Sequence, residues 1–205
     1  MARHPHVIAP FVTTPEEAPY PMSVAAEEAP ENAAGEAAES AVADLDFTRA
    51  MARVPGPVVV TTTVDDSGRR WGFTASSFVS LSLDPPLVTV SLDKKASTHS
   101  AFAVAGHFMV NVLAHDQSEI ARRFATSGVD RFAAGDTEPL ERGLPGIPRA
   151  VVRLACRMHE VVDGGDHSML VGRVLDCVTS HEREALVYVD RGFVRPAAPD
   201  AAGAR

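Results

Sequence analysis

Runs of β-branched and aromatic residues, each bounded by Gly, Pro, Asp or Ser, dominate the chain from residue 58 onward. Runs of this length and composition predict β-strands, and the short turns between several of them favour antiparallel neighbours. The strands do not alternate with helices at the spacing of βαβ units, so the pattern indicates a mainly β fold of the barrel type. We expect strands at 58–64, 70–78, 87–92, 108–113, 149–162 and 168–179, with shorter ones at 186–189 and 192–194.

Helical periodicity is restricted to short segments at the edge of this predicted sheet. Phe47, Ala50, Met51 and Val54 recur at helical spacing, which predicts one apolar helix face. Asp44 can cap the first turn of that helix. We expect two further helices, one at 97–104 and one at 116–128. A loop rich in Pro and Gly is expected at 129–148.

The two ends of the chain differ in composition from its middle. Residues 1–43 contain seven Glu against one Arg and few large apolar side chains, so they cannot bury enough surface to offset the entropy of ordering. We expect a disordered acidic arm there, although its Ala and Glu would also allow a helix that docks on a partner. The folded domain is predicted to span 44–196, and a frayed tail follows at 197–205.

Charge and motif content exclude several classes of function. The net charge is −8 and no basic stripe is present, which argues against binding to nucleic acid or to an anionic membrane surface. No apolar run approaches the roughly 20 residues that span a bilayer. Cys156 and Cys177 lie in apolar runs, which is typical of buried thiols in a reducing cytoplasm. The histidines lack metal-ligand spacing and no GxGxxG or GxSxG motif occurs, so we expect no metal site, doubly wound nucleotide fold or nucleophilic catalysis.

The segment GFTASSF at 72–78 is the first candidate for chemistry. A flavin needs an approachable backbone and hydrogen-bond donors near its ring and its phosphate, and Thr74, Ser76 and Ser77 supply small hydroxyls. The same residues also suit an ordinary polar edge strand, so composition alone leaves both interpretations open. We expect the leucines that follow to fill the barrel core, namely Leu81, Leu83 and Leu87.

The segment SLDKKASTHS at 91–100 is the second candidate. Lys94 and Lys95 follow a strand end and precede the hydroxyls of Ser97 and Thr98 at a helix start, which indicates a phosphate site. Ordinary helix capping with solvated lysines explains the same residues equally well.

A histidine in a glycine-rich turn is the third candidate. His167 follows Gly164, Gly165 and Asp166 in a predicted hairpin, where the backbone is open to a ligand. An imidazole there can contact a nicotinamide or its phosphates, or relay a proton. Capping of the turn by Asp166 and His167 is the structural alternative.

Together these segments resemble the flavin reductase family of two-component monooxygenase systems. The resemblance rests on FTRAMARVPGPVVVTT (47–62), GFTASSFVSLSLDPPLVTVSLDKKAST (72–98), FMVNVLAHDQSEIARRFA (108–125) and GGDHSMLVGRV (164–174). It implies a split β-barrel with a Greek-key core and a few peripheral helices, acting as a homodimer with flavin near the subunit interface. The chain departs from the family at Pro55-Gly56-Pro57, where a Thr-Gly-Val-Thr-like turn is common, and this departure can alter flavin affinity or the choice between FMN and FAD.

The resemblance also implies roles for individual residues. Two strand segments would contact the flavin, the residues after the second strand would hold its phosphate, and the hairpin turn would face the nicotinamide dinucleotide. The flavin contacts would be Thr74, Ala75, Ser76, Ser77, Ser91, Leu92 and Asp93, the phosphate contacts Lys94, Ser97 and Thr98, and the turn residues Gly165, Asp166, His167 and Ser168, with His167 as the catalytic residue.

The implied activity is the reduction of FMN or FAD by NADH or NADPH, with the reduced flavin passed to a separate monooxygenase. Two alternatives stay open: a split barrel that retains its flavin and acts directly on an organic substrate, and a non-catalytic flavin- or haem-binding module. The sequence does not distinguish FMN from FAD, or NADH from NADPH, and it does not identify the partner monooxygenase.

Overall fold

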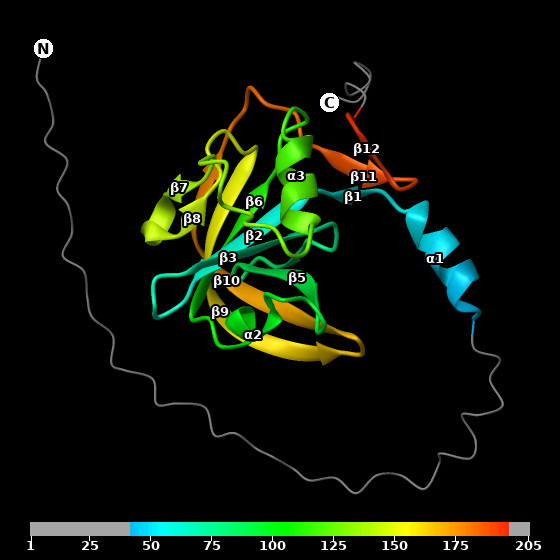
Figure 1. The fold of residues 1–205 in the computed structure, drawn as a ribbon, viewed down its shortest axis with the longest axis horizontal. Coiled ribbons are helices and arrows are strands. Elements are labelled where there is room, and N and C mark those ends of the chain that lie inside the picture. The colour runs from blue at the N-terminus through cyan, green and yellow to red at the C-terminus, as the bar shows by residue number, and fades with distance from the viewer. Residues whose placement is uncertain (1–41, 197–205) are drawn as a thin grey trace, which may run out of the picture. The chain divides into compact units, whose positions relative to one another are not determined.

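A curled seven-stranded antiparallel sheet forms the body of the protein (Figure 1). The computed structural model describes residues 42–196. Its helices are α1 (Asp44–Ala52), α2 (His99–Ala103) and α3 (Ser118–Ala125), with a 3-10 turn at Glu141–Gly143. Its strands are β1 (Gly56–Pro57), β2 (Val59–Val64), β3 (Arg70–Ala75), β4 (Val79–Ser82), β5 (Leu87–Asp93), β6 (His107–Val112), β7 (Glu138–Pro139), β8 (Pro145–Gly146), β9 (Val152–Gly164), β10 (His167–Thr179), β11 (Val187–Val189) and β12 (Gly192–Val194).

The strand order explains why this barrel is split. The large sheet runs β3-β2-β6-β9-β10-β5-β4, and every neighbouring pair is antiparallel. No ladder joins the two edge strands β3 and β4 within residues 42–196, so the sheet curls without closing. Two small sheets, β1-β11-β12 and β7-β8, lie beside it. The fold is therefore a mainly β split barrel with few helices, as the sequence predicts.

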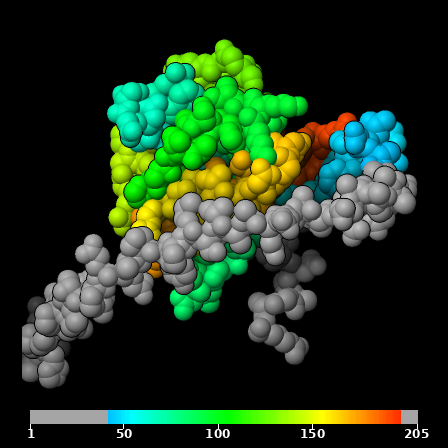
Figure 2. Space-filling model, turned by 90° about the horizontal axis from the view of Figure 1, so that it is seen from below, coloured from blue at the N-terminus to red at the C-terminus, as the bar shows by residue number. Residues whose placement is uncertain are grey.

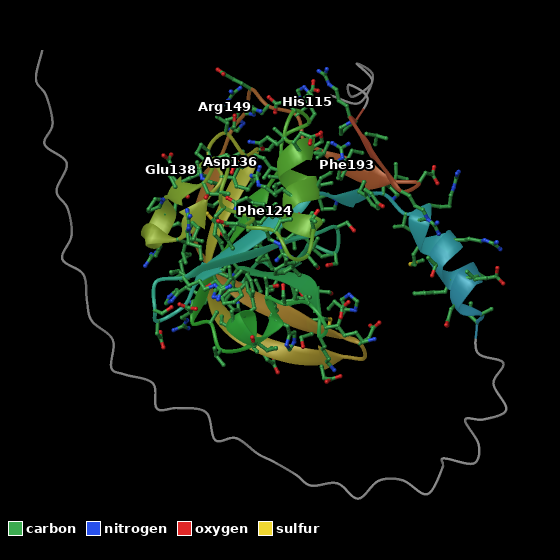
Figure 3. The ribbon with its side chains drawn as sticks, in the orientation of Figure 1. His115, Phe124, Asp136, Glu138, Arg149 and Phe193 are labelled. Carbon is green, nitrogen blue, oxygen red and sulfur yellow. The ribbon has the colours of Figure 1, made fainter. Side chains whose placement is uncertain are left out.

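Two large apolar clusters fill most of the space around the sheet, and a third, small one contains Met109, Leu144 and Ala155. In the larger cluster Phe73 meets Phe102 of α2 edge to face, with ring centroids 4.9 Å apart. In the second cluster Phe124 of α3 packs on β2 and β3, and Figure 3 shows it between that helix and the sheet. Gly72 makes this approach possible, because a Cβ at that position would lie 2.7 Å from the Phe124 ring. Burial of these aromatic side chains supplies much of the driving force for the fold.

The first helix lies apart from both clusters. Its end is joined to the β11–β12 turn by a hydrogen bond from Asp190 N to Ala52 O and by an ion pair between Arg53 and Asp190. Figure 2 shows this helix in blue beside β11 and β12 in orange and red. None of its residues is buried, so its apolar face is uncovered in the single chain.

Several sequence predictions need correction. The stretch 71–93 holds three strands rather than two, because β4 forms after the chain leaves the sheet at Ser76. Leu81 and Leu83 are exposed, Leu83 by 90%, because the edge strand β4 and its turn cover nothing on that side. The first helix begins at Asp44 and its cap is Ala43, so Asp44 does not cap it.

The cysteine prediction is half right. Cys156 is buried in the core, and burial raises the pKa of its thiol to about 12. Cys177 is an exposed free thiol, because the end of β10 extends beyond the core. The predicted acidic arm, up to residue 41, and the predicted tail at 197–205 lie outside the described residues, so both stay predictions.

Candidate functional site

A cavity of about 580 Å³ brings together residues from four distant parts of the chain. We call it the serine pocket. Small ligands typically occupy cavities of about 300–1,000 Å³, so this one is of suitable size. Its lining consists of the serines Ser76, Ser77 and Ser91, the hairpin residues Gly164, His167 and Met169, the α1 residues Phe47 and Met51, and Val54, Pro55 and Gly56 after that helix.

The serines meet because β3 ends at Ala75 and the chain then passes alongside β5. Ser77 Oγ accepts a hydrogen bond of 2.9 Å from the Ser91 N–H, and this bond joins the two segments. Gly56 packs so closely on Ser76 that a Cβ there would lie 2.6 Å from the Ser76 carbonyl oxygen. Only glycine fits at position 56, because any side chain there would clash with the Ser76 backbone at the edge of the pocket.

The hairpin that carries His167 is clamped to the segment after β5. Lys94 Nζ donates to Asp163 Oδ2 and to the Gly165 carbonyl, each at 2.6 Å, and Lys94 N donates to Asp166 O at 3.0 Å. The ammonium group lowers the pKa of the Asp163 carboxyl. Lys94 is thus paired with the turn in the single chain, and its predicted contact with the flavin phosphate stays a prediction.

His167 stands at the start of β10 with a carboxylate beside it. Its Nδ1 lies 2.7 Å from Asp166 Oδ1, and this contact lowers the pKa of the Asp166 carboxyl. Gly165 supplies the left-handed residue of the turn, with φ of 79°. Ser168 is buried beneath the turn, with its Oγ 2.9 Å from His99 Nε2 of α2. The His167 ring is partly exposed and lines the serine pocket, where it can contact a ligand.

A second cavity, of about 690 Å³, contains the predicted phosphate residues Ser97 and Thr98. We call it the arginine pocket, because Arg69, Arg70 and Arg131 line it. Trp71, Gly72 and the segment 128–130 with Phe132 complete the lining. The predicted site residues therefore divide between two cavities rather than filling one.

The remaining predicted residues lie outside both cavities. Thr74 Oγ1 donates to the Ala121 carbonyl of α3 at 2.7 Å, and Ala75 packs on the larger apolar cluster. Leu92 is a buried core residue, because it points from β5 into the barrel. Asp93 accepts a hydrogen bond from Lys95 N at 2.7 Å and so stabilises the turn.

The sequence interpretation missed two sets of lining residues. It predicted the apolar face of α1 without assigning Phe47, Met51 and Val54 to a site, although their helical spacing was a usable signal. The basic pair Arg69-Arg70 beside the single tryptophan was also a signal, but its meeting with Arg131 depends on the tertiary fold. No group of three His, Cys, Asp or Glu that could hold a metal occurs within residues 42–196. No helix in that part of the chain is long and apolar enough to cross a bilayer.

The serine pocket combines apolar side chains, small hydroxyls and one imidazole. This combination suits a planar ring with polar edges, as a flavin has. The family model described as "Flavin reductase like domain" matches residues 51–197. The chain therefore belongs to the flavin reductase family and is an oxidoreductase.

Named relatives share most of this chain. It is 42% identical to an NADH:riboflavin 5′-phosphate oxidoreductase of Streptomyces pristinaespiralis, over 80% of this chain and 94% of the relative. The NADH:FAD oxidoreductase SgcE6 of Streptomyces globisporus, solved in complex with NAD and FAD fragments, has a TM-score of 0.71 and 35% identity over 77% of this chain and 94% of that one. The flavin reductase of the styrene monooxygenase of Pseudomonas putida S12 has a TM-score of 0.69 and 27% identity over 75% of this chain and 99% of that one.

Proposed function

We propose that the protein reduces FMN or FAD at the expense of NADH or NADPH, with the flavin ring in the serine pocket. The observation that carries the proposal is the meeting of Ser76, Ser77 and Ser91 with His167 in one cavity. Membership of the flavin reductase family supports the same reaction. The reaction transfers a hydride from the nicotinamide to the flavin, and it needs ring proximity more than a strong acid or base.

The residues of the serine pocket have distinct parts in this proposal. The serine hydroxyls and the nearby backbone would hydrogen-bond the polar edge of the ring, where negative charge accumulates on reduction. Phe47, Met51 and Val54 would cover the apolar edge and exclude water. His167 would contact the nicotinamide dinucleotide, with Asp166 orienting the imidazole through the 2.7 Å contact.

We further propose that the protein acts as a homodimer. Two apolar surfaces are uncovered in the single chain, one on α1 and one on β4 and its turn. Contiguous apolar surface of this kind is characteristic of protein interfaces. The α1 surface also borders the serine pocket, so a partner subunit seated there would complete the wall of the flavin site. The exposed side chains are Leu45, Phe47, Met51 and Val54 on the first surface and Val79, Leu81 and Leu83 on the second.

The reduced flavin would leave and supply a separate monooxygenase. Relatives are reductase components of such systems, including the trigonelline monooxygenase of Acinetobacter baylyi. Ser76 and Ser77 are exposed at the serine pocket, and an exposed site suits release of the product. We place the protein in the cytoplasm, where NADH is available.

Steady-state oxidation of NADH in the presence of FMN or FAD tests this function. With flavin in large excess over protein, we expect many turnovers per protein molecule. Reduction that stops after one equivalent would support the direct oxidoreductase that retains its flavin. An absence of reaction, with flavin bound, would support a binding module and overturn the proposal.

A further inference from the structure

The wall of the serine pocket that α1 supplies is not held in place by core packing. Phe47 and Met51 line that pocket, yet both are exposed, and no residue of α1 is buried within residues 42–196. Burial of an apolar face usually determines where a helix lies, and α1 lacks such burial. Other contacts must therefore set the position of this wall.

These contacts come from the β11–β12 turn, which lies beside the C-terminal end of the helix (Figure 1). The Asp190 N–H donates to the Ala52 carbonyl at 2.6 Å, and Arg53 Nη1 donates to both carboxylate oxygens of Asp190 at 3.1 Å. The Ala52 carbonyl belongs to the last turn of the helix, where carbonyls have no partner within the helix. Asp190 alone thus satisfies the end of the helix and pairs with the side chain that follows it.

The same hairpin also holds the chain on the other side of this wall, because β1 pairs antiparallel with β11. The segment that leads from one attachment to the other, Val54 to Gly56, lines the serine pocket. The hairpin therefore fixes this segment from both ends, although Arg53 and Asp190 are 137 residues apart in sequence.

The turn has a backbone conformation that is unusual for its residues. Asp190 and Arg191 both lie in the left-handed region, with φ of 50° and 60°. A two-residue hairpin turn of this kind is commonly Asn-Gly, because both positions require a positive φ. An asparagine at position 190 would suit the turn at least as well as aspartate does. The charge of Asp190 is therefore explained by its contact with Arg53 rather than by the turn.

We propose that Arg53 and Asp190 are positioning residues for the flavin, which hold the α1 wall of the serine pocket against the apolar part of the ring. The inference rests on the proposed function, which places that ring in the serine pocket. Neither residue lines the pocket, so the pair acts only through the segment that it holds. Because it acts on the ring rather than on a phosphate, riboflavin, FMN and FAD should depend on the pair to the same degree.

The variant Asp190→Asn separates this role from a role in the turn. It keeps the backbone N–H and a favoured turn residue, and it removes only the charge that pairs with Arg53. Flavin binding is measured in the full-length protein without NADH, from the loss of flavin fluorescence. We expect the dissociation constants of riboflavin, FMN and FAD each to rise about threefold to fivefold, which is the effect that an exposed ion pair can have. The free energy of unfolding should not fall.

Variants of Arg53 test the pair from the other side. Arg53→Met should weaken the binding of all three flavins as Asp190→Asn does, and Arg53→Lys should restore most of the affinity. The double variant Arg53→Met/Asp190→Asn should bind no more weakly than either single variant, because the two substitutions remove the same contact. The matched control is Arg49→Met, since Arg49 is exposed on the same helix and contacts Asp46 rather than the turn. It should leave all three dissociation constants unchanged.

Steady-state kinetics give a readout that general destabilisation would not produce. In Asp190→Asn, the KM for FMN should rise with the dissociation constant, whereas the KM for NADH at saturating FMN should be unchanged. Sedimentation velocity at the assay concentration should show the same oligomeric state for the variant and for the unmodified protein.

The inference is overturned if Asp190→Asn and Arg53→Met bind the three flavins as tightly as the unmodified protein. Weaker binding that accompanies a loss of folding stability or a change of oligomeric state would also overturn it, because the pair would then act on the fold or on assembly. In these cases the unmodified protein still binds and reduces flavin, so the proposed function stands. An unmodified protein that binds no flavin would refute the proposed function, and this role with it.

Discussion

The two ends of the barrel differ in how far their polar groups are paired and their apolar side chains are covered. At the α3 end, formed by α3 and segment 126–150, most buried polar side chains have partners within the chain, although Asp136 Oδ1 has none among the described residues. The Asn111 side chain donates to Val60 O at 3.0 Å and accepts from Ile147 N at 2.9 Å. Glu141 and Arg153 form a two-pronged ion pair with side chains only 18% and 15% exposed. Asp136, labelled in Figure 3 beyond α3, pairs with Arg123.

The hairpin end, formed by α1, β4 and the turn at 163–168, leaves comparable groups uncovered. Phe47 and Met51 are 58% and 48% exposed. In the Lys94–Asp163 pair that holds the turn, the Asp163 side chain is 79% exposed and the Lys94 side chain 35%. An end whose polar groups are paired and whose apolar side chains are buried is stable by itself. An end with uncovered apolar side chains and exposed polar groups needs a ligand or a second chain to cover them. The difference predicts that substitutions at the α3 end and in the core affect stability, and that those at the hairpin end affect assembly and reaction.

The largest effect on stability should come from the tightest packing in the barrel. A Cβ at Gly172 would lie 2.4 Å from the ring of Phe108 and 2.9 Å from Cys156 Cβ. We expect Gly172→Val to lower the free energy of unfolding by about 3 kcal/mol, because the neighbours are core residues that cannot move aside. Urea denaturation measures this loss.

Gly106→Ala is the matched control, because a Cβ there would have open space within 4 Å. It should change the free energy of unfolding by less than about 0.5 kcal/mol. Equal effects of the two substitutions would show that glycine backbone freedom, rather than packing, limits the fold at these positions.

The next effect concerns the uncovered face of α1. We expect Phe47→Ser/Met51→Ser to raise the dissociation constant of the proposed dimer about 100-fold, because two large apolar side chains leave the interface. Sedimentation velocity over a dilution series measures it. Val104→Ser is the control, since Val104 is 83% exposed and lies outside both apolar surfaces. A protein that is monomeric at every concentration, before any substitution, would contradict the dimer.

This contrast also explains how far the sequence could predict the structure. Runs of β-branched residues predicted the long strands, because a strand buried on one side must carry them. The spacing of Phe47, Met51 and Val54 predicted a helix with an apolar face. Such periodicity shows that the face should be buried, but it does not identify the part of the protein, or the partner, that buries it. The strand β4 was missed because Ser76 to Phe78 break the ladder without any Gly or Pro to mark the break.

The site was predicted less completely, for a related reason. Ser76, Ser77 and His167 were recognised from local chemistry and Ser91 from the family resemblance, and the structure brings all four to one cavity. Lys94 was assigned to a phosphate because hydroxyls follow it in sequence. Its contact with Asp163, which is 69 residues away, could not be predicted from the sequence, because only the tertiary fold brings the two residues together.

A substitution in the hairpin clamp tests whether Lys94 acts on the hairpin or on the flavin. We expect Lys94→Met to lower kcat/KM for NADH about tenfold, with the dissociation constant of FMN unchanged, because the turn that carries His167 loses its anchor. His167→Ala should show the same pattern more strongly. Stopped-flow kinetics and flavin titration together measure both quantities.

The other lysine of the chain is the matched control. Lys95 is exposed and its side chain has no ion pair within the described residues, so Lys95→Met should leave both quantities unchanged. Lys94→Arg should restore part of the NADH activity. If Lys94→Met instead weakens FMN binding as much as NADH use, the ammonium contacts the flavin phosphate as the family resemblance implies.

The smallest effect is a pH dependence at the α3 end. The Arg153 guanidinium lowers the pKa of the Glu141 carboxyl below its ordinary value of 4.5. The ionised carboxylate therefore stabilises the folded protein, and this contribution is complete above that value and is lost as the pH falls below it. We expect Glu141→Gln to lower the free energy of unfolding by about 1 kcal/mol at neutral pH and by progressively less below pH 4.5, as measured by urea denaturation at each pH.

The control is Glu184→Gln, which removes an exposed ion pair with Arg195 and should cost no measurable stability at any pH. If the two substitutions behave alike, the pairs at the α3 end are no better sheltered than those in solvent, and the distinction between the two ends fails.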